Sequence, residues 1–321
     1  MIKLKTFGSF TVGNDLTSVP EGAWRSEKLE KLFVYLAINR NRGVCIEDIS
    51  EAIWQVEEET DNPVGALKNL AYRLRKALRD ASFDEECIVS VRGGLYKWND
   101  DVEVTIDVEE FDRYINEAEM AFCRSKETAI ESYEKAIALY HGDFLPLRTD
   151  THWFMTLNAF YHSRYVNTVK ALAKLYIDTG CYEKLEQLCT KAIVYERSDE
   201  QIYSYLIVAR MRTKKVQMAF DTYETAKAIM DKDLGVRKTV MLNKVYEELL
   251  SVTKGASSYN IDEVKDDISE ESMNGVFMCG YPVFKEIYQL EVRKSARSTI
   301  PESLVPVSYT HLRAHETLMN L

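Results

Sequence analysis

The spacing of hydrophobic residues along the chain changes near residue 103. Before that point, short β-branched runs flank segments in which apolar residues recur every three or four positions. After it, helical periodicity continues almost unbroken to about residue 253. The pattern therefore predicts a mainly α protein, with an N-terminal domain of mixed α and β structure followed by an all-α domain.

The first 100 residues contain a specific order of predicted elements. In chain order they are a strand pair (2–12), three helices (27–38, 46–54 and 62–79) and a β-hairpin (88–98). Ser26 is the expected N-cap of the first helix, and Arg92-Gly93-Gly94 forms the expected hairpin turn. Strands, three helices and a terminal hairpin are typical of a winged helix-turn-helix.

The segment 62–79 combines an apolar stripe with a cationic surface. Its leucines recur at helical spacing (Leu67, Leu70, Leu74 and Leu78), and Asn62-Pro63 is a strong helix start. Five of its residues are basic and none is acidic, in a chain whose formal net charge is −10. Such a helix can pack on its own domain with one face and meet phosphates and base edges with the other.

We expect this helix and the hairpin tip to contact DNA. The candidate DNA-binding residues are Lys68, Asn69, Tyr72, Arg73, Arg75, Lys76, Arg79 and Arg92. The alternative interpretation is a solvated surface helix. Residues 1–100 contain 14 Lys and Arg against 16 Asp and Glu, so binding would depend on a local basic patch and on dimerisation at repeated sites.

The all-α region contains an internal repeat. The segments that begin at Cys181 and Lys215 are offset by 34 residues, and three apolar pairs fall in register: Leu185/Ala219, Cys189/Tyr223 and Ala192/Ala226. A period of about 34 residues in paired helices is typical of tetratricopeptide repeats. The helices expected at 165–179 and 199–212 would supply the first member of each pair.

The C-terminal part of the sequence differs from the rest. Residues 254–272 carry six acidic residues and predict a solvated linker. Residues 273–306 resemble the start of a further domain that is cut short. Residues 307–321 are similar to a translated sequencing-library adapter, so we assign no function to the histidines there.

Composition excludes several classes of site. The six cysteines include no CxxC pair, which favours reduced thiols and a cytoplasmic protein over a disulfide frame or a zinc site. No phosphate-binding loop, nucleophile motif or histidine ligand spacing is present. No apolar run approaches the length of a membrane span. We therefore predict a protein that is not an enzyme and needs no cofactor or metal.

Two groups of residues resemble one bacterial family. WRSEKLEKLFVYLAINRNRGVCIEDISEAIW, ALKNLAYRLRKAL and IVSVRGGLYKW resemble the OmpR-type winged helix of SARP-type transcriptional activators. Ile106–Val108, AIALYHGDFL at 136–145, and Leu234-Gly235-Val236 resemble the bacterial transcriptional activator domain that follows it in that family. Where the family usually has a proline after Leu-Gly-Val, this chain has Arg237-Lys238-Thr239.

The resemblance implies a domain plan and partners. The expected divisions are a winged helix DNA-binding domain (1–102), a tetratricopeptide-like activator domain (103–253), the linker (254–272), the truncated domain (273–306) and the adapter-like tail (307–321). The implied partners are double-stranded promoter DNA, RNA polymerase and a second copy of the chain. The alternative is a protein-interaction scaffold whose winged helix binds a protein partner.

Overall fold

The computed structural model describes residues 1–14, 18–19, 24, 26–54, 62–81, 83, 87–91, 94–146, 151–234, 239–255, 287 and 289–290. At 88–91, 233–234 and 252–255 the structure describes the backbone alone. Arg92, the adapter-like tail and nearly all of the predicted linker and truncated domain lie outside the described residues. The domain boundaries expected from the sequence therefore stay a prediction.

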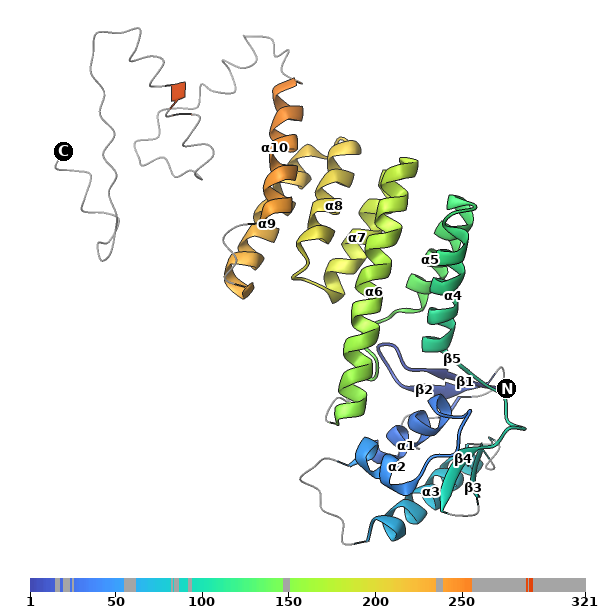
Figure 1. The fold of residues 1–321 in the computed structure, drawn as a ribbon. Helices are drawn as coiled ribbons and strands as arrows, with labels where there is room; N and C mark the ends of the chain where they lie inside the picture. The colour runs from blue at the N-terminus through green and yellow to red at the C-terminus, as the bar shows by residue number, and fades with distance from the viewer. Residues whose placement is uncertain are drawn as a thin grey trace, which may run out of the picture. The chain divides into compact units, whose positions relative to one another are not determined.

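The N-terminal part folds as the predicted winged helix (Figure 1). Strands β1 (Ile2–Lys5) and β2 (Thr11–Gly13) pair antiparallel, and helices α1 (Glu27–Ile38), α2 (Ile46–Ile53) and α3 (Pro63–Asp80) follow. The hairpin consists of β3 (Ile88–Val91) and β4 (Leu95–Trp98). Ser26 takes the N-cap position of α1, but its side chain makes no capping hydrogen bond.

One strand departs from the predicted pattern. Residues from Val104 onward were expected to be helical, but β5 (Val104–Ile106) is a strand that pairs parallel to β1, with Leu4 opposite Ile106. The sheet order is β2-β1-β5. Only three residues long, β5 is too short for periodicity to distinguish it from the helix that begins at the next residue.

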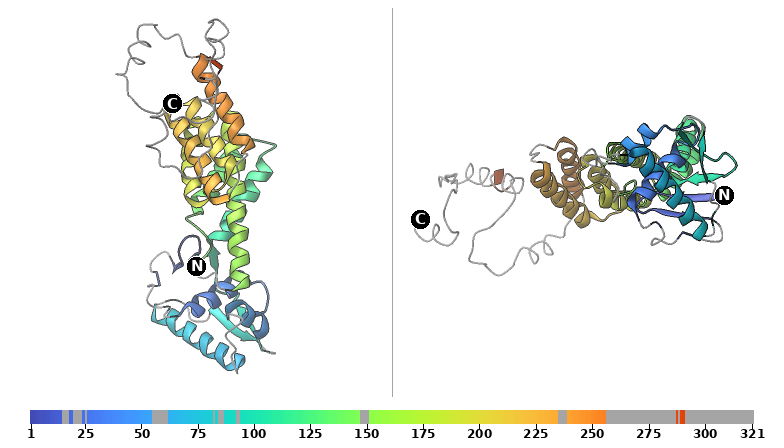
Figure 2. Two further views of the ribbon diagram at one scale, coloured as in Figure 1. Left: turned by 90° about the vertical axis from the view of Figure 1, so that its left-hand side faces the viewer. Right: turned by 90° about the horizontal axis from the view of Figure 1, so that it is seen from below.

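The predicted helical repeats are present. After α4 (Asp107–Ala121) and α5 (Lys126–Leu139) come α6 (His152–Thr179), α7 (Tyr182–Tyr195), α8 (Glu200–Arg212), α9 (Val216–Leu234) and α10 (Val240–Gly255). Figures 1 and 2 show α6–α10 packed one after another. All six residues that the 34-residue offset paired are buried. The repeat is thus built from the small and apolar residues that the sequence placed in register.

A buried carboxylate joins β1 to α4. Asp107, the first residue of α4, accepts hydrogen bonds from the backbone N–H groups of Thr6 (2.7 Å), Phe7 (3.0 Å) and Val108 (3.0 Å). It also accepts one from the Thr6 hydroxyl at 2.6 Å. Burial raises the pKa of the Asp107 carboxyl, and the hydrogen bonds that it accepts oppose this shift. Three of these hydrogen bonds come from Thr6 and Phe7, so the segment after β1 is fixed to the start of α4 by three polar contacts.

Two glycines allow the segment after β1 to approach the end of α5. Gly8 has φ +75°, and a Cβ atom there would lie 2.4 Å from the carbonyl oxygen of His141. Gly142 lies opposite, with 3.1 Å between its ideal Cβ position and the Cα of Gly8. The Gly8 N–H donates to the Asp143 carbonyl at 2.9 Å. Larger side chains at either position would push these backbones apart.

Further contacts connect the winged helix to α4 and α6. Arg40, after α1, forms a two-pronged ion pair with Glu109, in which Nη2 lies 2.7 Å from Oε2. The Thr151 hydroxyl donates to the Ala52 carbonyl of α2 at 2.8 Å. The Tyr35 and Trp153 rings pack edge to face, with centroids 4.8 Å apart. One hydrophobic core consequently extends from the sheet through the winged helix into the first repeat helices.

Replacing Asp107 by alanine should lower the free energy of unfolding by about 3 kcal/mol, because three backbone N–H groups lose a charged partner. Chemical denaturation of the full chain measures the change. Asp101→Ala, at an exposed carboxylate, is the matched control and should cost less than about 0.5 kcal/mol. Equal losses in the two variants would contradict the role of Asp107.

His162 connects three segments of the helical domain. Its Nδ1 lies 3.1 Å from Asp143 Oδ1, before α6, and its Nε2 lies 3.1 Å from Glu196 Oε2, after α7. Tyr140 donates to the same Asp143 oxygen at 3.0 Å. Burial lowers the pKa of His162, but the hydrogen bonds to Glu196 and Asp143 raise it by more, so its net pKa lies above the ordinary histidine value.

The His162 contacts should make stability depend on pH. Because the folded pKa is raised, the contribution is fully present below the unfolded value of about 6.5 and is lost as pH rises through the folded pKa. The difference in unfolding free energy between the wild type and His162→Gln should be larger at about pH 5.5 than at about pH 8.5. A difference that does not change with pH would exclude this titration.

Candidate nucleic-acid interface

Helix α3 separates the leucine and cation surfaces as predicted. Its buried residues are Leu67, Leu70, Ala71, Leu74, Ala77 and Leu78, which pack against α1 and α2. In Figures 1 and 2, α1 and α2 lie between α3 and the start of α6. The helix therefore uses one face to complete the core of the winged helix, and its opposite face is exposed.

The structure places most candidate side chains on that opposite face. Lys68, Asn69, Tyr72, Arg73, Lys76 and Arg79 are exposed, whereas Arg75 is half-buried at the edge. Tyr72 is 65% exposed, which is unusual for an aromatic side chain. Arg92 lies outside the described residues. Seven of the eight candidates thus belong to one helix.

The start of α3 is fixed by its cap. The Asn62 side chain accepts a hydrogen bond from the Gly65 N–H at 2.9 Å, and Pro63 occupies the first helical position. A Cβ atom at Gly65 would lie 2.8 Å from the Asn62 amide nitrogen, so glycine leaves room for the cap. The cap fixes the backbone of the first helical turn, in which the Val64 side chain is 43% exposed. Sequence periodicity did not single out Val64, because its position suits either face.

The hairpin is attached to the helices by its backbone. Val44, between α1 and α2, exchanges two 2.8 Å hydrogen bonds with Tyr96 of β4. Gly94, in the turn, has φ +80°, a conformation that glycine adopts without strain. Lys97 pairs with Asp100 at 2.5 Å. The hairpin is consequently held beside α2 and the core of the winged helix.

Acidic residues on α2 limit the basic surface. Glu47, Asp48 and Glu51 are exposed on this helix, whereas α3 has no acid before Asp80. The acidic side chains of α2 therefore oppose attraction to phosphate beside α3, and the attraction of the α3 cations falls off within about 8 Å at physiological salt. The surface is suited to a localised contact with a duplex rather than to coating it.

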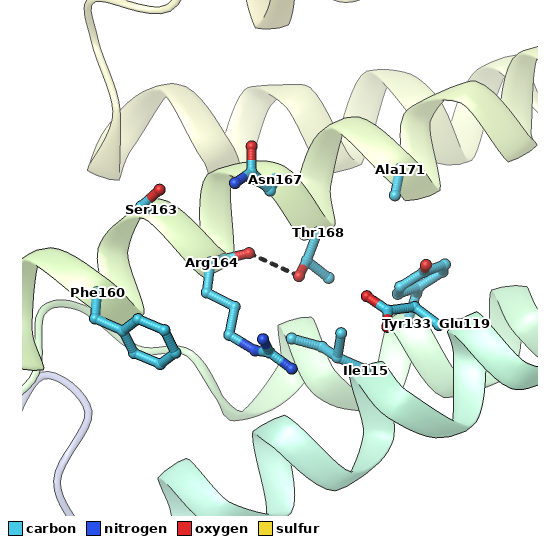
Figure 3. A pocket seen from close by; sticks show the side chains of 9 residues that line it. All are labelled: Ile115, Glu119, Tyr133, Phe160, Ser163, Arg164, Asn167, Thr168 and Ala171. Carbon is cyan, nitrogen blue, oxygen red and sulfur yellow. Dashed lines mark hydrogen bonds between the residues drawn. The ribbon is translucent and has the colours of Figure 1, made fainter.

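The helical domain contains a pocket of about 400 Å³ between α4, α5 and α6 (Figure 3). It is lined by Ile115, Glu119, Tyr133, Phe160, Ser163, Arg164, Asn167, Thr168 and Ala171. The Arg164 guanidinium forms an ion pair with Asp112 at 2.7 Å, and Thr168 donates to the Arg164 carbonyl at 2.8 Å. These lining side chains include no histidine or cysteine. Among the described residues, no group of three or more His, Cys, Asp and Glu could hold a metal ion.

Comparison with known proteins agrees with the two-part architecture. Residues 23–98 match the family described as transcriptional regulatory protein, C terminal, and residues 106–250 match the bacterial transcriptional activator domain. The chain is a SARP-type transcriptional activator. DNA binding through the winged helix is the activity that follows from this pair of domains.

Two relatives illustrate the similarity of this activator. The transcriptional regulator RedD of Streptomyces coelicolor is 24% identical over 238 residues, covering 73% of this chain and 67% of RedD. The structure of Mycobacterium tuberculosis EmbR in complex with a low affinity phosphopeptide has a TM-score of 0.61 and 20% identity. That similarity covers 85% of this chain and 72% of EmbR, and it concerns the fold.

No helix in the described part of the activator is long and apolar enough to cross a bilayer.

Replacing Asn62 by alanine should destabilise the activator by about 1 kcal/mol, because the Gly65 N–H loses its capping acceptor. Thermal unfolding of the full chain measures the loss. Asn62→Asp is the matched control, because it retains a capping oxygen and should keep most of the stability. If alanine and aspartate behaved alike, the cap would contribute nothing.

Proposed function

We propose that the activator recognises promoter DNA by inserting α3 into the major groove. The observation that carries this proposal is the exposed face of α3, which presents Lys68, Arg73, Lys76 and Arg79 and no acid before Asp80. An α-helix fits the major groove, and cations at its edges can neutralise phosphates on both strands. The buried leucines on the other face support this orientation.

The remaining candidates complete the proposed interface. Arg75, at the edge of α3, would contact phosphate, and Arg92 at the hairpin tip would lie along the backbone or the adjacent minor groove. Since α2 is acidic, the whole winged helix supplies few phosphate contacts. Affinity per site should be modest, and we propose that two copies bind repeated sites together.

The helical-repeat domain is proposed to act through protein contacts. Stacked helices such as α6–α10 form extended binding surfaces, which suits contact with RNA polymerase, dimerisation or reception of a signal. We propose that the activator works in the cytoplasm on nucleoid DNA. It would act by binding and carry out no chemical step of its own.

Changing Arg73 and Lys76 together to alanine should weaken DNA binding and flatten its dependence on salt. Each lost phosphate contact removes about one unit from the slope of log K against log salt concentration. Fluorescence anisotropy with the full chain and its own upstream DNA, across a salt series, measures both quantities. Both side chains are exposed, so folding should be unchanged.

Lys174→Ala is the matched control, because Lys174 is an exposed cation on α6, outside the winged helix. It should leave affinity and salt slope unchanged. If the double variant bound DNA as the wild type does, α3 would not be the contact surface. In that case the alternative function, a protein-interaction scaffold, would be the one to test. Under that alternative the double variant would lose binding to a protein partner and not to DNA.

A further inference from the structure

The exposed surface of α3 carries two uncharged side chains at its middle. With about 3.6 residues per turn, the direction opposite the buried leucines can be followed along the helix. The residues nearest to it are Gly65, Asn69, Tyr72, Lys76 and Arg79. Arg73 and Arg75 lie toward the two edges. Asn69 and Tyr72 therefore occupy the part of the surface that would reach deepest into a groove.

The fold itself does not account for these two side chains. Tyr72 is 65% exposed and Asn69 is also exposed, whereas the packing of α3 against α1 and α2 is made by its leucines and alanines. Within the described part of the chain, neither side chain takes part in a hydrogen bond or ring contact. A large exposed aromatic beside an amide, surrounded by cations, has the composition of a recognition surface.

Their chemistry matches one kind of base pair. The Asn69 amide offers a donor and an acceptor, which is the arrangement that pairs with N7 and N6 of adenine in the major groove. The Tyr72 ring is a flat apolar surface of the kind that packs on the methyl group of thymine. Residues three apart on a helix have Cβ atoms about 5–6 Å apart, which corresponds to one or two base-pair steps of about 3.4 Å.

We propose that Asn69 reads an adenine and that Tyr72 packs on the methyl group of a thymine one or two base pairs away. The two side chains thus select A·T pairs under the centre of α3, while the surrounding cations hold the phosphates. This inference rests on the proposed function, because it assumes that α3 occupies the major groove.

Base analogues test the two contacts separately. The full chain first selects its preferred sequence from a random duplex library, and each adenine or thymine of that sequence is then replaced in turn. 7-Deazaadenine removes the N7 acceptor, and uracil removes the thymine methyl. The wild type should lose about fivefold or more in affinity at one adenine and a measurable amount at a nearby thymine.

Variants assign each loss to a side chain. Asn69→Ala should bind the unmodified site more weakly and show no further loss with 7-deazaadenine at the critical position. Tyr72→Ala should become insensitive to uracil at the neighbouring thymine. Tyr72→Phe, the matched control, should remain sensitive to uracil because its ring still packs on the methyl group.

The outcomes distinguish the inference from the function on which it rests. If Asn69→Ala and Tyr72→Ala kept the full sensitivity of the wild type to every analogue, these side chains would not read bases and the inference would be overturned. That result would leave DNA binding by α3 intact. If the wild type selected no sequence at all from the library, the proposed function itself would fail.

Discussion

A single buried carboxylate determines how the N-terminal strand meets the helical domain. Asp107 lies where β5 ends and α4 begins, and it accepts the backbone N–H groups that follow β1. A carboxylate removed from water needs hydrogen-bond donors, and the N–H groups of Thr6 and Phe7 are two of the donors that Asp107 has. The contact fixes the register of β1 beside β5, with Leu4 opposite Ile106. It also places Phe7 against Phe111 and Tyr161, whose ring centroids lie 5.3 Å and 5.6 Å from that of Phe7.

A second set of contacts, between the winged helix and α6, positions α3. Helix α3 packs on α1 and α2, and α2 in turn contacts α6, so the orientation of α3 is transmitted through closely packed helices. Phe33 and Leu32 at the centre of α1 are fully buried, and such interiors resist compression. Thr151 and Trp153, at the start of α6, touch the winged helix directly. A partner that moved the start of α6 would therefore act on α1 and α2 before it acted on α3.

The elements with strong periodicity could be predicted from the sequence, and the contacts between them could not. The leucines of α3 and the cap at Asn62 determine that helix locally, and the register of the two repeat units follows from their apolar residues. In contrast, Lys31 is only 1% exposed, because Phe154 of α6 covers it, with 5.8 Å between Nζ and the ring centroid. A lysine on an amphipathic helix is ordinarily expected in solvent. Its burial depends on a residue more than a hundred positions away, and so does the role of Asp107.

The parallel pairing of β1 with β5 has a consequence for synthesis on the ribosome. The first strand of the chain can pair with β2 as soon as both have emerged, but its other edge has no partner until β5 and Asp107 follow. Throughout that interval the nascent winged helix carries an open strand edge and two uncapped N–H groups. Completion of the DNA-binding fold is therefore coupled to the appearance of the next domain. A ribosome that paused before Asp107 would leave an unfinished sheet exposed to pairing with neighbouring chains.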